Sequence, residues 1–144
     1  MKIAVIDGQG GRLGRLLIES LRERLGQRAW IIALGTNAIA TSQMNKAPCD
    51  ACATGESAIS FNSPRVDVIA GSIGIIASGA MHGEVSPEIA CSVAESDALK
   101  ILIPFNKCNL RVMGVADDSM TACVTAAVDD IAALCENSAE QRGI

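Results

Sequence analysis

The sequence predicts an α/β fold, a three-layer sandwich in which helices cover both faces of a mostly parallel β-sheet. Three observations predict it. Short apolar runs rich in β-branched residues recur along the chain, segments with helical periodicity alternate with them, and glycine-bearing turns directly follow several of the runs. The chain has 144 residues, of which 49% are hydrophobic, so it has the length and apolar content of one domain with a substantial core.

The first part of the chain predicts two strand–helix units. Residues 2–7 are an apolar run that a glycine ends, which is typical of a strand buried on both faces of a parallel sheet. Leucines at helical spacing across residues 13–25 predict a helix with one apolar face. Residues 29–34 predict a second buried strand, and Thr36 or Asn37 is expected to cap a shorter helix behind it.

The middle of the chain is less regular. Residues 47–64 lose periodicity, so we expect a long loop there with at most a short strand at residues 58–61. Residues 66–70 resume the sheet, and a helix is expected to follow from about Ile75. A Ser-Pro-Glu sequence then predicts the start of a helix over residues 86–96.

The last part of the chain predicts two strands and a helix. Residues 100–104 and 110–115 are apolar runs separated by too few residues for a parallel crossover, so we expect an antiparallel hairpin at the sheet edge. A final helix is expected over residues 118–135. We therefore expect one Rossmann-like domain over residues 1–136, followed by a frayed C-terminal tail at 137–144.

Composition and charge exclude several functional classes. The formal net charge is −4 and the chain has no Tyr, two Phe and one Trp, whereas a nucleic-acid binder needs a basic face and stacking rings. No apolar run reaches the ~20 residues of a membrane span. The chain opens on a predicted strand without a signal-peptide pattern, so we expect a cytoplasmic protein whose six cysteines are reduced.

The strongest functional signal lies where the first strand meets the first helix. Glycines there allow a tight turn, and the free N–H groups and positive dipole end of a helix favour an anion. Arginines in the first helical turn oppose the dipole unless an anion is bound. We expect a nucleotide or another phosphate-bearing small molecule here, with a turn that only allows tight packing as the alternative. The candidate residues are Asp7, Gly8, Gln9, Gly10, Gly11, Arg12, Leu13 and Gly14.

Further candidate residues follow from the expected topology. Ligands of open α/β sheets bind beyond the carboxyl ends of the strands. The segments that follow the other predicted strands carry small and polar residues, which also suit ordinary turns. The candidates there are Gly35, Thr36, Asn37, Gly71, Ser72 and Asn106.

The motif defines the ligand only in part. The glycine spacing departs from G-x-G-x-x-G because position 13 is leucine, and Arg15 and Leu16 stand where a P-loop needs Lys and Ser or Thr. No carboxylate ends the second strand to hold a ribose hydroxyl, so among nicotinamide cofactors we expect NADPH rather than NADH. Asp7 places a carboxylate beside the phosphate site and could act through Mg²⁺ or a ribose hydroxyl.

Other reactive side chains give weaker signals. Cys49 and Cys52 form a C-x-x-C, but a second pair that would complete a zinc site is missing from the sequence. His82 is the single histidine, and a general acid–base role for it stays open. The sequence predicts no metal site and leaves the catalytic residues undefined.

One resemblance concerns the amino-terminal segment. Residues 1–21, with Gly11-Arg-Leu-Gly-Arg15, resemble the NADPH-binding segment of dihydrodipicolinate reductases, whose turn carries a similar Gly-Arg-Met-Gly-Arg run. The paired histidines and the lysine that those reductases use have no counterpart in this chain. The resemblance therefore implies neither their reaction nor their catalytic residues.

A second resemblance spans nearly the whole chain. The chain is similar to a small bacterial family known as domain of unknown function 3842. The shared sequences include Asp7-Gly-Gln-Gly-Gly11, Ala33-Leu-Gly-Thr-Asn37, Ala53-Thr-Gly-Glu56 and Gly83-Glu84. The resemblance implies a Rossmann-like fold and nucleotide binding, and it adds no substrate.

Three functional hypotheses follow. The leading one is a cytoplasmic protein that binds a nucleotide or similar phosphate-bearing molecule at the turn from Gly8 to Gly14, as a homo-oligomer. The second is an NADPH-dependent reductase completed by a dimer or a partner. The third is a structural or interaction module without a ligand. The sequence does not decide whether the protein is an enzyme.

Overall fold

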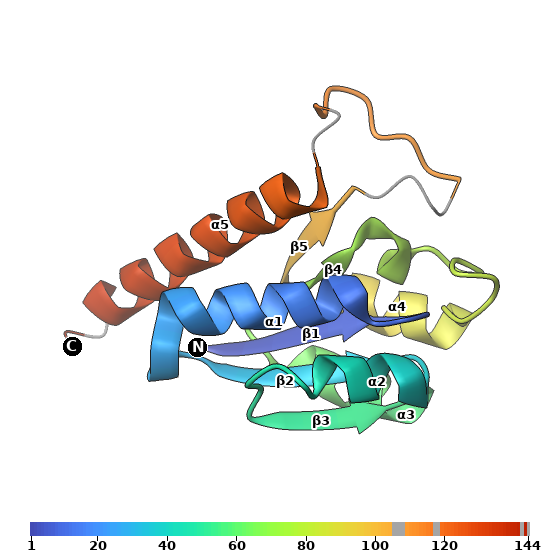
Figure 1. The fold of residues 1–144 in the computed structure, drawn as a ribbon, viewed down its shortest axis with the longest axis horizontal. Helices are drawn as coiled ribbons and strands as arrows, with labels where there is room; N and C mark the ends of the chain where they lie inside the picture. The colour runs from blue at the N-terminus through green and yellow to red at the C-terminus, as the bar shows by residue number, and fades with distance from the viewer. Residues whose placement is uncertain (105–108, 117–118, 142, 144) are drawn as a thin grey trace.

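The computed structural model describes residues 1–104, 109–116, 119–141 and 143. Five strands form one sheet in the order β3-β2-β1-β4-β5, and every neighbouring pair is parallel (Figure 1). The predicted α/β class with a parallel sheet is therefore confirmed. The strands are β1 (Lys2–Asp7), β2 (Trp30–Gly35), β3 (Ala51–Thr54), β4 (Val68–Ser72) and β5 (Leu99–Ile103).

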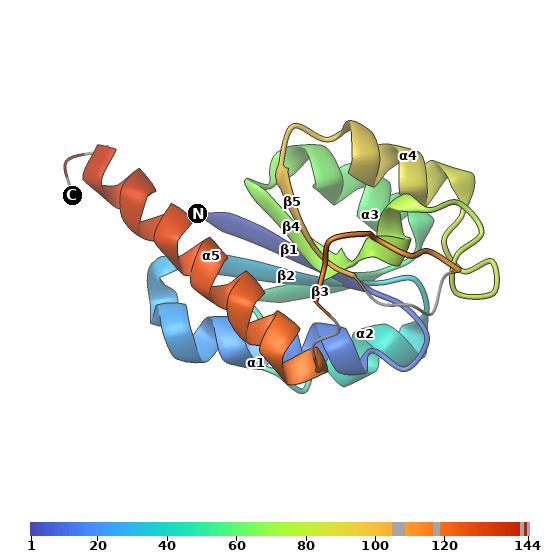
Figure 2. The ribbon, with the colours of Figure 1, turned by 90° about the horizontal axis from the view of Figure 1, so that it is seen from above.

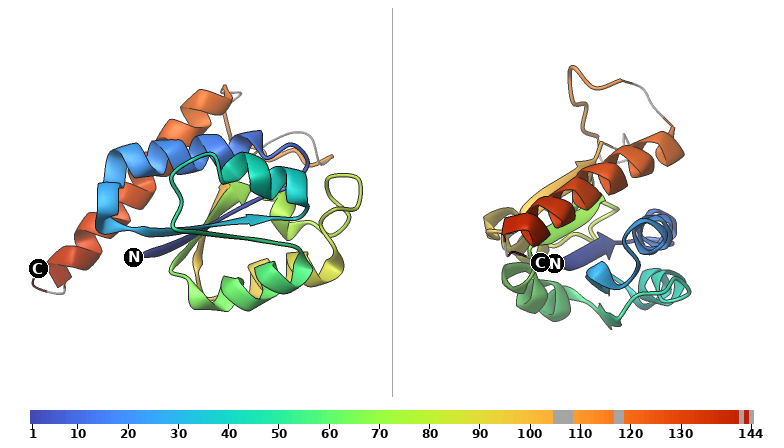
Figure 3. Two further views of the ribbon diagram at one scale, coloured as in Figure 1. Left: turned by 60° about the horizontal axis from the view of Figure 1, so that its bottom comes forward. Right: turned by 90° about the vertical axis from the view of Figure 1, so that its left-hand side faces the viewer.

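Helices cover both faces of this sheet. Helices α1, α2 and α5 lie on one face and α3 and α4 on the other, which gives the three layers visible in Figure 2 and in the left view of Figure 3. The helices are α1 (Arg12–Leu25), α2 (Ala38–Met44), α3 (Glu56–Asn62), α4 (Pro87–Glu95) and α5 (Met120–Gln141). Short 3-10 turns are η1 (Gly26–Arg28), η2 (Ser63–Arg65) and η3 (Ile73–Ile76).

Strand β1 lies at the centre of the sheet and divides the core in two. Ile3 and Val5 pack in the cluster with α1 and α5, whereas Ala4 and Ile6 pack in the cluster with α3 and α4. All four side chains are fully buried. This is the expected behaviour of an apolar run in a parallel sheet, because side chains alternate between two covered faces. The strand order reverses at β1, so a crevice opens beyond the carboxyl ends of β1 and β4.

The predicted antiparallel edge hairpin is wrong. Strand β5 runs parallel to β4, and helix α4 connects the two strands. Residues 110–115 form no strand. The prediction joined two apolar runs because they are close in sequence, but the second run leads toward α5 and does not return to the sheet. Alternating apolar residues without a neighbouring strand gain little from an extended conformation. The exposed large side chains of this segment are Leu110, Val112, Met113 and Val115.

Two predictions for the middle of the chain are also wrong. The predicted long loop contains a strand, β3, and a helix, α3, which covers the residues 58–61 expected to be extended. Strand β3 is an edge strand of small residues, and α3 buries only Ile59, so both elements lack strong periodicity. After β4 the chain forms the short turn η3 where the sequence predicts a longer helix.

The helix ends largely follow the predicted caps. Asn37 Oδ1 accepts the Ala40 N–H at 2.9 Å before α2, and Ser86 Oγ accepts the Ile89 N–H at 3.2 Å before α4. Helix α5 continues to Gln141, so it includes residues that the sequence analysis assigns to a frayed tail. None of the described helices is long and apolar enough to cross a membrane.

Candidate functional site

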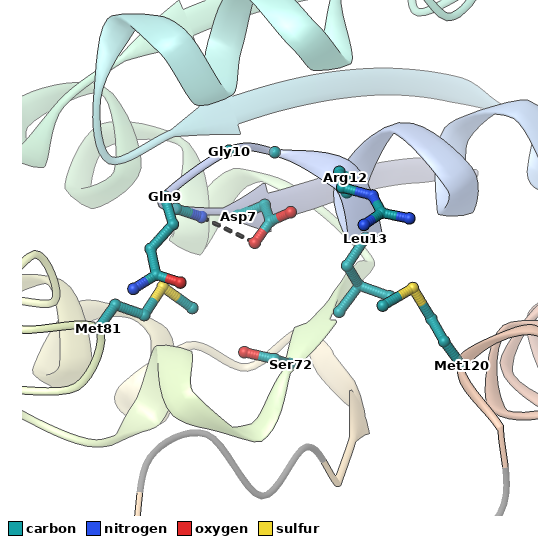
Figure 4. Close-up of a pocket in the computed structure, with 10 residues that line it drawn as sticks. Asp7, Gln9, Gly10, Arg12, Leu13, Ser72, Met81 and Met120 are labelled. Carbon is teal, nitrogen blue, oxygen red and sulfur yellow. Dashed lines mark hydrogen bonds between the residues drawn. The ribbon is translucent and has the colours of Figure 1, made fainter.

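A pocket of about 150 Å³ lies at the carboxyl ends of β1 and β4, beside the start of α1 (Figure 4). Most of the predicted glycine turn lines it, together with Ser72 from β4 and two methionines. This is the place where ligands of open α/β sheets bind. The lining residues are Asp7, Gly8, Gln9, Gly10, Gly11, Arg12, Leu13, Ser72, Met81 and Met120.

Asp7 closes the inner side of the glycine turn. Its side chain is 6% exposed, and its two carboxylate oxygens accept the N–H groups of Gly8 and Gly14, each at 2.8 Å. Gly14 is the third residue of α1, so the carboxylate satisfies one of the free donors of the helix and meets its positive dipole end. Part of the anion-binding capacity of this helix is therefore already used by the protein itself.

Three glycines of the turn are closely surrounded, and Gly11 is the one that meets backbone. An alanine Cβ at Gly8 would lie 2.6 Å from Met81 Sδ, and at Gly14 it would meet Met44 Sδ and lie 2.9 Å from Asp7 Cβ. Gly11 has φ 72° and would place a Cβ 2.6 Å from the Ala40 carbonyl oxygen. Gly10 differs, because a Cβ added there would have no other atom within 4 Å. Packing against the α2 backbone thus explains Gly11, whereas Gly8 and Gly14 meet side-chain atoms and Gly10 faces open space.

The start of α1 still offers donors to the pocket. The N–H groups of Arg12 and Leu13 have no acceptor within the described residues, whereas the Gly11 N–H donates to the Gly8 carbonyl. The Arg12 side chain is exposed and forms no ion pair with a carboxylate in the described part of the chain. Arg15, in contrast, is paired with Glu19 at 2.7 Å. Arg12 is therefore the cation of this turn that a ligand can meet.

Ser72 lies across the pocket from the glycine turn. It is 5% exposed, and its Oγ is the buried side-chain polar atom that lacks a hydrogen-bond partner among the described residues. Such atoms are rare, because leaving a buried hydroxyl unpaired is costly. In Figure 4 the hydroxyl points into the pocket. Ser72 is a predicted site residue because it ends a predicted strand, and in the structure it lines the pocket at the end of β4.

Glu84 holds the turn that lines the pocket, although the sequence offers it only as part of a family motif and not as a site residue. One oxygen, Oε1, accepts the Gln9 N–H at 2.9 Å, the Thr36 hydroxyl at 2.8 Å and the Asn37 amide at 2.6 Å. Burial alone would raise the pKa of Glu84, but these hydrogen bonds and the nearby charge of His82 lower it below its ordinary value. The carboxylate is therefore held ionised against the turn.

The side chains of Thr36 and Asn37 consequently make their hydrogen bonds within the protein and not to a ligand. The amide nitrogen of Asn37 donates to Glu84 and to the Gln9 carbonyl oxygen. Its Oδ1 accepts the Ala40 N–H and caps α2. Glu84 also places a carboxylate next to the end of β2, where the sequence has none. The expected preference for NADPH over NADH stays a prediction.

The segment that carries Glu84 has a strained backbone. Met81 and His82 both have φ 57°, a left-handed conformation that few residues other than glycine adopt, although histidine adopts it more often than methionine. Hydrogen bonds within the segment hold it, including Gly79 N–H to Val85 O at 2.7 Å and Glu84 N–H to Met81 O at 3.2 Å. This conformation brings Met81 to the pocket wall, although its sequence suggests only a filler of the core.

The remaining candidates lie away from the pocket or outside the described residues. Gly35 and Gly71 approach the backbone of Thr41 and Ile6 too closely for any other residue, so packing accounts for both. Asn106 lies outside the described residues. His82 is exposed and is absent from the pocket lining.

The cysteines form no site in the described part of the chain. Cys49 and Cys52 are free thiols, and no group of three or more His, Cys, Asp and Glu side chains among the described residues is arranged to hold a metal ion. Burial, and after it the neighbouring Cys52, raises the pKa of the Cys49 thiol. Cys49 is therefore a poorer nucleophile than an ordinary exposed cysteine.

The comparisons with known proteins concern the fold and the family. No curated protein is similar enough to this chain to count as a relative. A solved structure that is similar to it is the dodecameric FMN-dependent Ubix-like decarboxylase from Escherichia coli O157:H7, at 20% identity and a TM-score of 0.44. The match covers 91% of this chain and 76% of the decarboxylase chain, and it concerns the fold alone. Residues 2–136 match the family described as Domain of unknown function (DUF3842), and the chain therefore belongs to that family.

Proposed function

We propose that the protein binds a nucleotide or another phosphate-bearing small molecule in the pocket at the carboxyl end of β1. The observation that carries this proposal is that Arg12 and Leu13 line the pocket at the start of α1 and that their N–H groups have no acceptor in the described part of the chain. The first N–H groups of a helix bind phosphate through hydrogen bonds and through the helix dipole. The guanidinium of Arg12, which has no carboxylate partner among the described residues, adds a positive charge at the same end of the helix.

Asp7 limits how strongly this site attracts an anion. Its carboxylate already accepts two backbone N–H groups and carries a negative charge next to the proposed phosphate. The remaining donors therefore have to outweigh a repulsion. We expect Arg12 to supply a large part of the attraction, because it is the cation of the turn without a carboxylate partner in the described residues.

Removal of the Arg12 side chain is expected to weaken phosphate binding. In Arg12→Ala, the Kd for ribose 5-phosphate should rise by roughly tenfold, because one charge-assisted hydrogen bond is lost. Arg15→Ala is the matched control. It removes an arginine from the same helical turn, but the guanidinium of Arg15 is already paired with Glu19. Isothermal titration calorimetry on the two variants measures both effects. Equal Kd values for Arg12→Ala and the unmodified protein would contradict the placement of the phosphate.

A thermal-shift panel tests the whole proposal and its alternatives. NADPH, NADH, ATP, GTP, FMN and S-adenosylmethionine each raise the melting temperature if they bind the folded state alone. At least one of them is expected to do so near millimolar concentration. A shift with NADPH alone would favour the reductase completed by a second copy or a partner. No shift with any compound or with ribose 5-phosphate would reject ligand binding and favour an interaction module.

A further inference from the structure

The pocket has the size of one six-membered ring. Its volume is about 150 Å³, and an apolar protein cavity of ~150 Å³ is known to accommodate benzene. A fused three-ring system such as isoalloxazine is much larger than benzene. The pocket is half open, so this volume describes the part that can enclose a single ring, while the sugar and the phosphate lie along its open side at the glycine turn.

The walls of the pocket suit the faces of an aromatic ring. Leu13 and Met120 lie on one side and Met81 on the other (Figure 4). Thioethers make favourable contacts with aromatic rings and adapt their shape to them. No aromatic side chain is among the described residues that line this pocket. The methionines, which come from two distant segments, therefore provide the apolar surface against which a ring can pack.

The hydroxyl of Ser72 favours a ring that carries a hydrogen-bonding atom at its edge. This hydroxyl is buried, unpartnered among the described residues and directed into the pocket. A hydrocarbon ring would leave it unpaired, whereas a heteroaromatic ring with a carbonyl, amide or ring nitrogen at its edge would complete its hydrogen bonding. The glycine turn that would hold the phosphate lines the same pocket.

We infer that the ligand is a phosphorylated compound with a single six-membered heteroaromatic ring, of the pyrimidine or pyridine nucleotide class. The ring lies between Met81 and Met120 with its polar edge at Ser72, and the phosphate lies at the start of α1. This inference rests on the proposed function, because it assumes the phosphate site at Arg12 and Leu13. It adds the identity of the group that the rest of the pocket recognises.

A ring series tests this inference by calorimetry on the intact protein. The probes are ribose 5-phosphate, uridine monophosphate, nicotinamide mononucleotide, adenosine monophosphate and FMN. Uridine monophosphate or nicotinamide mononucleotide should bind roughly tenfold more tightly than ribose 5-phosphate, because one hydrogen bond and ring contacts are gained. The purine and the flavin nucleotide should show no such gain.

The failure of this inference is distinguishable from the failure of the proposed function. If ribose 5-phosphate binds and the single-ring nucleotides bind no more tightly, the ring site is rejected while the phosphate site stands. If FMN shows the largest gain, the single-ring size limit is rejected. If none of the probes binds, the proposed function is rejected and the ring site with it.

Ser72→Ala provides a second readout. The variant should lose most of the tenfold ring preference while it keeps the ribose 5-phosphate affinity, and its melting temperature should not fall because the Ser72 hydroxyl has no hydrogen-bond partner among the described residues. Ser96→Ala is the matched control, since this buried hydroxyl donates to the Ser63 carbonyl and accepts the Ala98 N–H. It should melt at a lower temperature with an unchanged ring preference. An unchanged ring preference in Ser72→Ala would contradict the assigned role of its hydroxyl.

Discussion

Gly11→Ala should lower the free energy of unfolding by about 2–5 kcal/mol, whereas Gly10→Ala should change it by less than about 1 kcal/mol. Gly11 has φ 72°, a conformation that costs an alanine energy, and its added methyl group would lie 2.6 Å from the Ala40 carbonyl oxygen. That oxygen belongs to the α2 backbone, so it has little freedom to move. Gly10 has open space around its Cβ position.

Chemical denaturation of the two variants measures this difference directly. The two substitutions are chemically identical and affect adjacent residues, so any contrast between them reports the local packing of the turn. The pair also separates folding from binding, because Gly10→Ala is expected to stay folded while it changes a residue that lines the pocket. Equal losses of stability in both variants would contradict the assignment of Gly11 to packing and of Gly10 to the open side.

Glu84→Gln should lower the free energy of unfolding by about 1–2 kcal/mol at pH 7. The glutamine keeps an acceptor oxygen for Gln9, Thr36 and Asn37 but loses the charge that strengthens these hydrogen bonds. The segment around Met81 depends on them, because Glu84 ties it to the glycine turn. A denaturation series from pH 7 to pH 3 measures the effect, with Glu140→Gln, an exposed position near the end of α5, as the control.

The pH dependence of this effect has a defined sign. Hydrogen bonds and the charge of His82 hold the pKa of Glu84 in the folded protein below its ordinary value, although burial opposes them. The ionised carboxylate therefore favours folding fully above the ordinary glutamate pKa of about 4.3. This contribution disappears as the pH falls through the lower pKa of the folded state. A stability difference between Glu84→Gln and the unmodified protein that stays constant down to pH 3 would contradict this account.

Much of the fold follows from local patterns. The buried strands β1, β2 and β4 and the apolar face of α1 have clear periodicity, and the caps of α2 and α4 have the expected residues. Strand β3 and helix α3 are short and bury few large side chains, so their sequences give little signal. The hairpin failed because pairing in a sheet depends on the path of the chain between strands, and here that path passes through α4 before β5 and toward α5 after it.

The site was predictable where it depends on the ends of strands. The glycine turn, Arg12 and Ser72 were predicted to lie together because a parallel sheet brings the carboxyl ends of its strands together, and they line one pocket; their role in binding stays a prediction. Glu84 could not be found in this way, because its contact with Gln9 joins residues 75 positions apart through a segment that follows no strand. Met81 and His82 adopt left-handed conformations that usually need glycine. The sequence therefore shows no sign of the turn that they form.

Asn37 connects three parts of the molecule through one side chain. Its Oδ1 accepts the Ala40 N–H at the start of α2, while its amide nitrogen donates to Glu84 and to the Gln9 carbonyl oxygen. Helix α2, the glycine turn and the segment that carries Glu84 therefore share their hydrogen bonds. Opening one of these parts breaks bonds of the other two, so they form one cooperative unit. We therefore expect the amides of Gln9 and Ala40 to exchange with solvent at similar opening free energies.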